Sequence, residues 1–211
     1  MNKSFLYFSF FITVFSFSQT SELELWGKMS FKEKIKKKLF FSLEPGSRYN
    51  LDNFFFTKQF FDISLETTIY KGNLGEWSLD IGGRLTKMPN QRGAGKRQYL
   101  TSYYSKKIKA LSISWRSRLF FEQKITNYNK KYFRNKITIQ YNNFDFFRPF
   151  IDGEYLCGLN SNNINKIRYS FGNSFKISKK RTIKLFYRLQ STIEANTDKK
   201  RIFGIYISQK L

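Results

Sequence analysis

The chain has 211 residues and a formal charge of +23, from 38 Lys and Arg residues against 15 Asp and Glu residues. Hydrophobic residues make up 41% of it and aromatic residues 19%, which fits one folded domain of barrel or sandwich size. The sequence contains no His, which excludes catalysis by a Ser–His or Cys–His pair and any zinc site that uses His. Its one cysteine, Cys157, cannot form an internal disulfide.

The N-terminal segment has the pattern of a secretory signal peptide. Lys3 precedes an apolar run at residues 5–17, which is shorter than the roughly 20 residues that a membrane-spanning helix needs. A serine on each side of Phe17 supplies the small residues that cleavage requires. We expect residues 1–18 to be a Sec-type signal peptide of a Gram-negative bacterium and residues 19–211 to be the mature domain. A buried strand or an anchor helix is the alternative.

The middle of the chain alternates residue by residue between apolar and polar side chains. Phe61, Ile63 and Leu65 share one face of an extended segment, and Asp62 and Glu66 share the other. A period of two is typical of β-strands. The alternation covers residues 23–31, 39–44, 61–70, 77–86, 99–105, 111–122, 133–141, 151–157, 167–175, 183–190 and 203–207.

Strands about ten residues long with a charged polar face predict an all-β fold, a single antiparallel transmembrane β-barrel of the outer-membrane type. Such a closed barrel needs an even number of strands, so we expect roughly ten to twelve, given boundary errors of about two to four residues. The alternating segments number eleven, which is odd. Either Leu23–Phe31 is therefore not a full strand, or a further strand lies near Tyr49–Phe56. A soluble exported β-sandwich is the alternative fold.

The connections between the strands differ in length in a regular way. A barrel in the outer membrane has short periplasmic turns and long outer loops, so the pattern predicts a C-terminus on the periplasmic side. Short turns lie near Lys71, Lys106, Asn143 and Ser178, and longer loops lie near Asn50, Gln91, Asn127, Ser161 and Asn196.

The polar faces of the strands carry the scarce carboxylates together with arginines, whereas most lysines lie at strand ends and turns. The planar guanidinium suits an enclosed ion pair because it meets a carboxylate in two hydrogen bonds. We therefore expect Arg–carboxylate pairs to cross the lumen and to leave it largely closed; a lumenal site for a polar ligand is the alternative. The predicted lumenal ion-pair set is Glu44, Asp62, Glu66, Asp80, Arg84, Arg116, Arg118, Glu122, Asp152, Glu154, Arg168 and Arg188.

The remaining lysines and the aromatic residues predict contacts with a membrane. Lysines at a barrel rim can meet anionic lipid phosphates, including those of lipopolysaccharide, although simple solvation explains them as well. Export argues against nucleic acid as a partner. The expected partners are outer-membrane lipids and the barrel-assembly machinery, and the expected state is a monomer. The residues that could form aromatic girdles at the headgroups are Trp26, Trp77, Trp115, Tyr99, Tyr103, Tyr141, Tyr155, Tyr169 and Tyr187.

The sequence predicts no catalytic, metal or cofactor site. Asp152 and Glu154 lie two residues apart on one face, and such a carboxylate pair could carry acid–base chemistry. Arginines on the neighbouring strands favour salt bridges instead. No phosphate-binding loop, dinucleotide fingerprint or calcium loop is present in the sequence, and we expect the protein not to be an enzyme.

The order of these segments resembles a bacterial outer-membrane barrel family catalogued as domain of unknown function 2490, common in Bacteroidetes. The resemblance is carried by Leu25-Trp26-Gly27, Leu43-Glu44-Pro45, Ile81-Gly82-Gly83-Arg84, Trp115-Arg116-Ser117-Arg118, Arg148-Pro149-Phe150-Ile151-Asp152-Gly153-Glu154, Asn165–Gly172 and Leu185–Gln190. It implies a barrel in the outer membrane and no known activity, substrate or catalytic residue. Three functions stay open: a structural or binding barrel with a closed lumen, a small channel or ligand-uptake barrel, and a barrel enzyme that uses carboxylates.

Overall fold

The structure is a computed structural model that describes residues 22–89, 93–123, 129–144, 146–159, 164–193 and 199–211, without the side chains of residues 129 and 164. The expected signal peptide and the loop residues around Gln91, Asn127, Ser161 and Asn196 lie outside these residues. No helix in the described part of the chain is long and apolar enough to cross a membrane. The strands are β1 (Glu22–Lys36), β2 (Leu39–Asn50), β3 (Phe55–Gly72), β4 (Gly75–Lys87), β5 (Gly95–Ile108), β6 (Leu111–Gln123), β7 (Asn129–Tyr141), β8 (Phe147–Gly158), β9 (Ile164–Lys176), β10 (Arg181–Thr192) and β11 (Lys199–Lys210).

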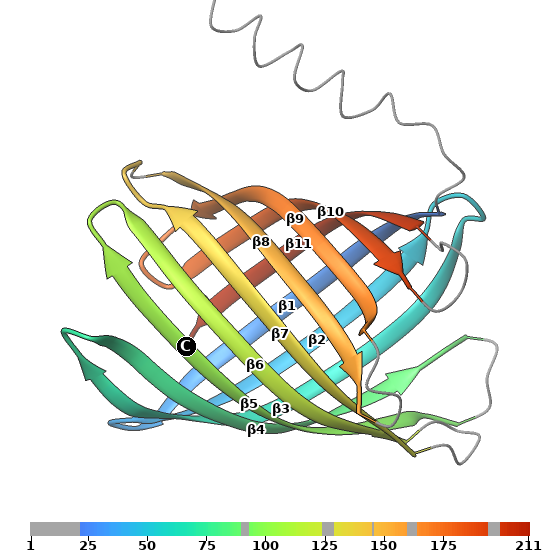
Figure 1. The fold of residues 1–211 in the computed structure, drawn as a ribbon, viewed down its shortest axis with the longest axis horizontal. Helices are drawn as coiled ribbons and strands as arrows, with labels where there is room; N and C mark the ends of the chain where they lie inside the picture. The colour runs from blue at the N-terminus through green and yellow to red at the C-terminus, as the bar shows by residue number, and fades with distance from the viewer. Residues whose placement is uncertain (1–21, 90–92, 124–128, 145, 160–163, 194–198) are drawn as a thin grey trace, which may run out of the picture.

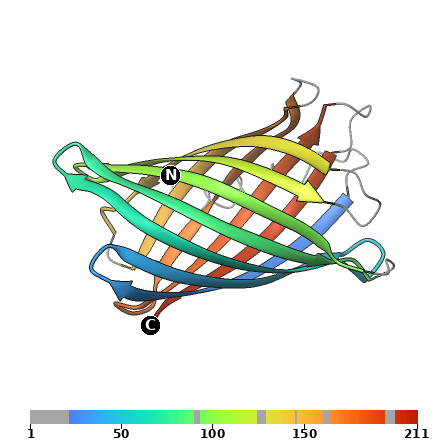
Figure 2. The same cartoon turned by 90° about the horizontal axis from the view of Figure 1, so that it is seen from below.

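The eleven strands form one closed barrel in which each strand pairs with its neighbours in sequence (Figure 1). The strands are tilted steeply around the barrel, as the view from below also shows (Figure 2). The prediction of a single barrel of ten to twelve strands is confirmed, and the alternative of a two-sheet sandwich is wrong.

The closure of the barrel differs from the prediction, because β1 and β11 run parallel. In an odd-numbered meander the first and last strands point the same way, so the seam between them has to be parallel. Both explanations offered for an odd count are therefore wrong. Leu23–Phe31 lies within β1, and Tyr49–Phe56 is divided between the end of β2 and the start of β3. The parallel register extends from Glu22 opposite Lys200 to Lys32 opposite Lys210.

The two ends of the barrel have different connections, and we call them the turn end and the loop end. The turn end has connections at residues 37–38, 73–74, 109–110, 142–146 and 177–180, and the loop end has those at 51–54, 88–94, 124–128, 159–163 and 193–198. The chain ends at the turn end, where the backbone N–H of Leu211 donates to the carbonyl of Lys32 over 2.9 Å. The predicted side of the C-terminus relative to the short turns is confirmed.

The hydropathy of the barrel is inverted relative to that of a water-soluble domain. Among the described residues, nineteen polar or charged residues are buried, whereas four large hydrophobic residues are. On β4 the apolar side chains point outward: Trp77 is 46% exposed and Ile81 64% exposed, while Ser78 and Asp80 between them are buried. An apolar outer band and a polar interior fit a barrel whose outer wall faces lipid.

Candidate functional site: the basic lumen

The lumen is built from the polar faces of the strands, because alternate residues of every strand point inward. The predicted pairing is seen most simply on β3 and β4, where Asp62 and Arg84 are cross-strand partners. Arg84 donates from Nε and Nη2 to the two carboxylate oxygens of Asp62, each over 2.5 Å. This is the two-bond geometry that makes Arg suitable for an enclosed pair.

One carboxylate on β8 holds three arginines. Glu154 accepts hydrogen bonds from Arg116 (3.1 Å) and Arg134 (2.5 Å) through Oε2 and from Arg168 (2.6 Å) through Oε1. Its side chain is 1% exposed. Arg168 also donates to the amide oxygen of Gln190 over 2.7 Å, so the cluster ties five neighbouring strands of the wall, β6 to β10, together.

The structure brings all twelve residues of the predicted set into ion pairs on the lumenal wall. The pairs beyond those already described are Lys28–Glu44 (2.5 Å), Lys32–Glu66 (2.7 Å), Arg97–Glu122 (2.9 Å), Arg118–Asp80 (3.6 Å), Lys136–Asp152 (2.6 Å) and Arg188–Asp152 (3.9 Å).

More lysines point into the lumen than the sequence pattern predicts. Lys28, Lys32 and Lys136 each neutralise a lumenal carboxylate, and Lys58 and Lys184 line the cavity. The prediction that lysines stay at strand ends and turns is therefore wrong for these residues. A long aliphatic stem lets a lysine whose backbone lies in the wall reach a partner across one or two strands. The inward parity of Lys28 with Glu24 and of Lys136 with Arg134 was the signal that the sequence offered.

Arginines stack on aromatic rings that lie against the inner wall. Phe60 lies over Gly46, its cross-strand partner, and the guanidinium of Arg84 lies 4.2 Å from the centre of its ring. Tyr99 lies over Gly82 in the same way, with Arg118 at 3.9 Å. A glycine gives room for the neighbouring ring to lie flat, and the ring face attracts the cation.

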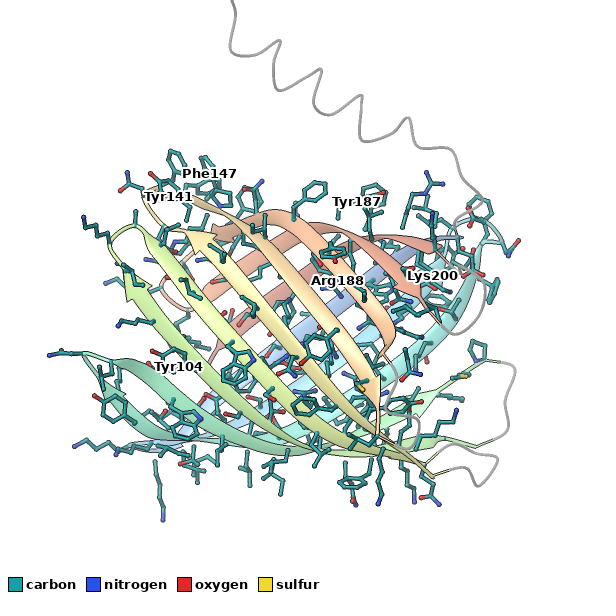
Figure 3. The ribbon with its side chains drawn as sticks, in the orientation of Figure 1. Tyr104, Tyr141, Phe147, Tyr187, Arg188 and Lys200 are labelled. Carbon is teal, nitrogen blue, oxygen red and sulfur yellow. The ribbon has the colours of Figure 1, made fainter. Side chains whose placement is uncertain are left out.

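The tryptophans divide between the two faces of the wall. Trp77 and Trp115 are exposed on the outside, as a girdle requires, but Trp26 lines the lumen. Tyr99 and Tyr103 also point inward, so the prediction that these three rings belong to a lipid-facing girdle is wrong. Figure 3 shows Tyr141, Phe147 and Tyr187 on the outer surface of the barrel and Arg188 among the side chains within it.

A cavity of about 1050 Å³ lies in the lumen and is lined by all eleven strands. It extends from Met88 and Gln123 at the loop end to Lys28, Thr138 and Lys184 toward the turn end. The ion pairs therefore lie along the wall and leave a hollow between them.

The lining of this cavity is strongly cationic. Fourteen lysines and arginines line it, against the four carboxylates of Glu44, Asp62, Glu122 and Asp152. Asp80 and Glu154 lie beneath the lining, where they are almost fully buried, and even with them the cations exceed the anions. A low-dielectric wall focuses such a charge on the enclosed solvent, so the cavity is suited to anions.

The two carboxylates considered for acid–base chemistry are both engaged in ion pairs. Asp152 is engaged by Lys136 and Arg188, and Glu154 is engaged by three arginines. No group of three or more Cys, Asp and Glu residues in the described part of the chain could hold a metal ion.

A family model described as "Protein of unknown function (DUF2490)" matches residues 23–201. No curated protein matches the chain in sequence.

Solved porin structures resemble the barrel. The NanC porin has a TM-score of 0.57 and 12% sequence identity, with 89% of this chain and 99% of that chain covered. The KdgM porin in complex with disordered oligogalacturonate has a TM-score of 0.53 and 14% identity, with 88% of this chain and 97% of that chain covered. A second KdgM porin structure has a TM-score of 0.51 and 14% identity, over 82% of this chain and 84% of that chain. At these identities the likeness establishes the fold, which is that of outer-membrane porins.

Proposed function

Because this chain belongs to the family described as a protein of unknown function (DUF2490), we propose its function from its geometry: an outer-membrane channel for small anionic solutes. The observation that carries the proposal is the excess of lysines and arginines over carboxylates around a cavity of about 1050 Å³. Rings of cationic side chains in a pore attract anions and repel cations.

The position of the ion pairs supports a conducting lumen and not a closed one. Arg84 and Asp62 are cross-strand partners, and Glu154 is held by arginines of neighbouring strands. Side chains that are paired along the wall are not free to cross the lumen. They stiffen the barrel and leave its axis to solvent.

A similar structure gives independent support for an anionic cargo. The KdgM porin is described in complex with disordered oligogalacturonate, which is a polyanion. The present barrel has the same kind of fold, and a lumen with an excess of positive charge suits a solute of that charge.

The test is the reversal potential of the refolded protein in a planar bilayer with a tenfold KCl gradient. We expect discrete conductance steps and a reversal potential of the sign that chloride permeation produces. A lumen closed by its ion pairs, as in a structural or binding barrel, would give no steps at all, and cation selectivity would contradict the anionic cargo.

We propose that the protein is exported by a Sec-type signal peptide and inserted as a monomer by the barrel-assembly machinery into the outer membrane of a Gram-negative bacterium. The outward apolar side chains support contact with lipid. With the turn end in the periplasm, outward lysines at the loop end, such as Lys87 and Lys131, lie near lipopolysaccharide phosphates. Cell fractionation and heat-modifiable mobility on gels test this; a freely soluble periplasmic protein would contradict it.

We also propose that the protein has no enzymatic activity. The ion pairs of Asp152 and Glu154 support this, because both carboxylates are already engaged by cations of the wall. Deletion of the gene should leave lipid and glycan profiles unchanged, and a change that Glu154→Gln reproduces would contradict the proposal.

A further inference from the structure

Several cations near the loop end of the lumen form no ion pair with a described carboxylate. Arg48, Lys58 and Lys166 line the cavity, and none of them is in an ion pair with another described residue. Nε of Arg48 is buried and has no hydrogen-bond partner among the described groups. An unpaired buried donor is costly unless a ligand or water satisfies it.

These cations face one another across the cavity. Arg48 on β2 and Lys58 on β3 are cross-strand partners, whereas Lys166 lies on β9, four strands away from β2 around the seam. Lys166 nevertheless interacts electrostatically with Arg48, as Lys58 does, and the nearby carboxylates of Glu24 and Glu122 offset only part of this repulsion. Like charges held together in this way create a local positive potential that an anion would relieve.

Trp26 holds the arginine of this cluster in position. The guanidinium of Arg48 lies 3.8 Å from the centre of the indole, and those of Arg168 and Arg188 lie at 5.5 and 5.4 Å. The indole N–H in turn donates to Glu24 over 2.6 Å. A guanidinium stacked on a fixed ring presents its N–H groups in the plane that a carboxylate requires.

The same part of the cavity offers a hydrogen-bond acceptor. Oδ1 of Asn165, the residue before Lys166, is buried without a donor and lines the cavity. A simple carboxylate has no donor for it, whereas a hydroxylated anion does. The combination of unpaired cations and an unpaired acceptor points to a ligand with both negative charges and hydroxyl groups.

We infer that Arg48, Lys58, Lys166 and Asn165 form a binding subsite for sugar acids at the loop end of the lumen. The inference rests on the proposed anion channel and names where and what it binds. Toward the turn end, Lys28 and Lys136 are paired with carboxylates, and Lys184 lies on β10, apart from the cluster. The group of unpaired cations at the loop end therefore binds anions most strongly and fills first.

The first test is block of the single-channel current of the full-length refolded protein by trigalacturonate added on the loop side. Tricarballylate, which has three carboxylates and no hydroxyl, and maltotriose, which is neutral, are the matched probes. Trigalacturonate should block at concentrations roughly three- to tenfold lower than tricarballylate, because a hydroxyl that donates to Asn165 adds one neutral hydrogen bond, which is worth about that factor. Maltotriose should not block. Equal block by the two anions would overturn the sugar-acid assignment.

The second comparison separates a subsite from the general field of the lumen. Arg48→Gln and Lys166→Gln should each raise the half-blocking concentration of trigalacturonate about tenfold. Lys184→Gln removes the same charge from another cavity-lining lysine, which lies 5.5 Å from the ring of Phe150 toward the turn end, and should change it less than about twofold. Equal effects of all three variants would overturn the subsite while leaving anion selectivity intact.

A binding measurement keeps the inference testable if the barrel does not conduct. With Trp77 and Trp115 replaced by Phe, Trp26 is the sole tryptophan, and its fluorescence reports on Arg48 directly. Titration with trigalacturonate in detergent should change the emission saturably, and Arg48→Gln should abolish the change. No response in the parent protein would overturn the subsite.

Discussion

Replacement of Glu154 by Gln tests whether the lumenal ion pairs stabilise the barrel. The carboxylate neutralises Arg116, Arg134 and Arg168 at 3.1, 2.5 and 2.6 Å and is 1% exposed. Glutamine has nearly the same shape, so the variant removes the charge with little change in packing. It leaves three arginines close together with one fewer anion.

The size of the effect follows from this geometry. A unit-charge pair at about 4 Å attracts by about 4 kcal/mol at an effective dielectric constant of about 20. The total attraction of the three arginines to Glu154 is smaller than three times this value, because the arginines repel one another and all four groups lose hydration. Removal of one partner of a buried pair costs about 3–5 kcal/mol. Because Arg116 is 24% exposed beside the cavity, we expect the lower part of this range, about 3 kcal/mol.

The assay is urea unfolding in lipid vesicles, followed by tryptophan emission and by the heat-modifiable band on gels. The control is Glu76→Gln, because Glu76 pairs with Lys71 at 2.9 Å where the side chains are 41% and 74% exposed; such a surface pair contributes less than about 1 kcal/mol. If Glu154→Gln were as stable as Glu76→Gln, the cluster would be solvated and the reasoning refuted.

Three further predictions concern the wall. Ile81→Lys should destabilise the barrel in vesicles by about 2–4 kcal/mol, since Ile81 is 64% exposed on the outer face; an unchanged urea midpoint would contradict a lipid-facing position. Gly204→Val should lower the free energy of unfolding by about 1–3 kcal/mol, because a Cβ there would lie 1.9 Å from the ring of Phe186. Gly153→Ala should be neutral, because a Cβ at Gly153 would have nothing within 4 Å. Equal stability of the two variants would refute the glycine–aromatic packing. In a Cys157→Ser background, cysteines that replace Leu25 and Phe203, which are partners across the parallel seam, should cross-link on oxidation. The control pair replaces Tyr187 and Phe203, which are partners across β10 and β11. If the control pair cross-linked and the seam pair did not, the parallel closure would be contradicted.

The sequence predicted the wall of the barrel well because a period of two is a local property. The alternation from Phe61 to Leu85 predicted β3 and β4 and the face on which each residue lies. Asp62 and Arg84, which were assigned to the lumen by parity alone, are cross-strand partners at 2.5 Å. Parity is preserved wherever strands pair without a slip, so a charged residue on the polar face reaches the lumen.

The parallel seam could not be predicted from the alternation. It depends on the number of strands, which is a property of the whole chain, and a one-strand error in counting reverses the direction of closure. The rule of an even strand number also predicts a further strand near Tyr49–Phe56. In the structure this segment is the end of β2, a connection and the start of β3.

The positions of Trp26 and the lumenal lysines were mispredicted for a different reason. The residue type of Trp26 favours a lipid-facing girdle, whereas its parity places it on the same face as Glu24 and Lys28. In the structure Trp26 stacks with arginines and Lys28 pairs with Glu44. The polar neighbours in the lumen, and not the side chain's own preference, decide where such amphipathic residues lie.

The most direct test of the account is the ion selectivity of the purified, refolded protein in a planar bilayer. The cationic lining of the cavity predicts a reversal potential with the sign of the chloride equilibrium potential in a tenfold KCl gradient. Glu154→Gln, which removes one negative charge, should shift it further in that direction. A cation-selective pore, or a silent bilayer with protein that is folded by its heat-modifiable mobility, would contradict the account.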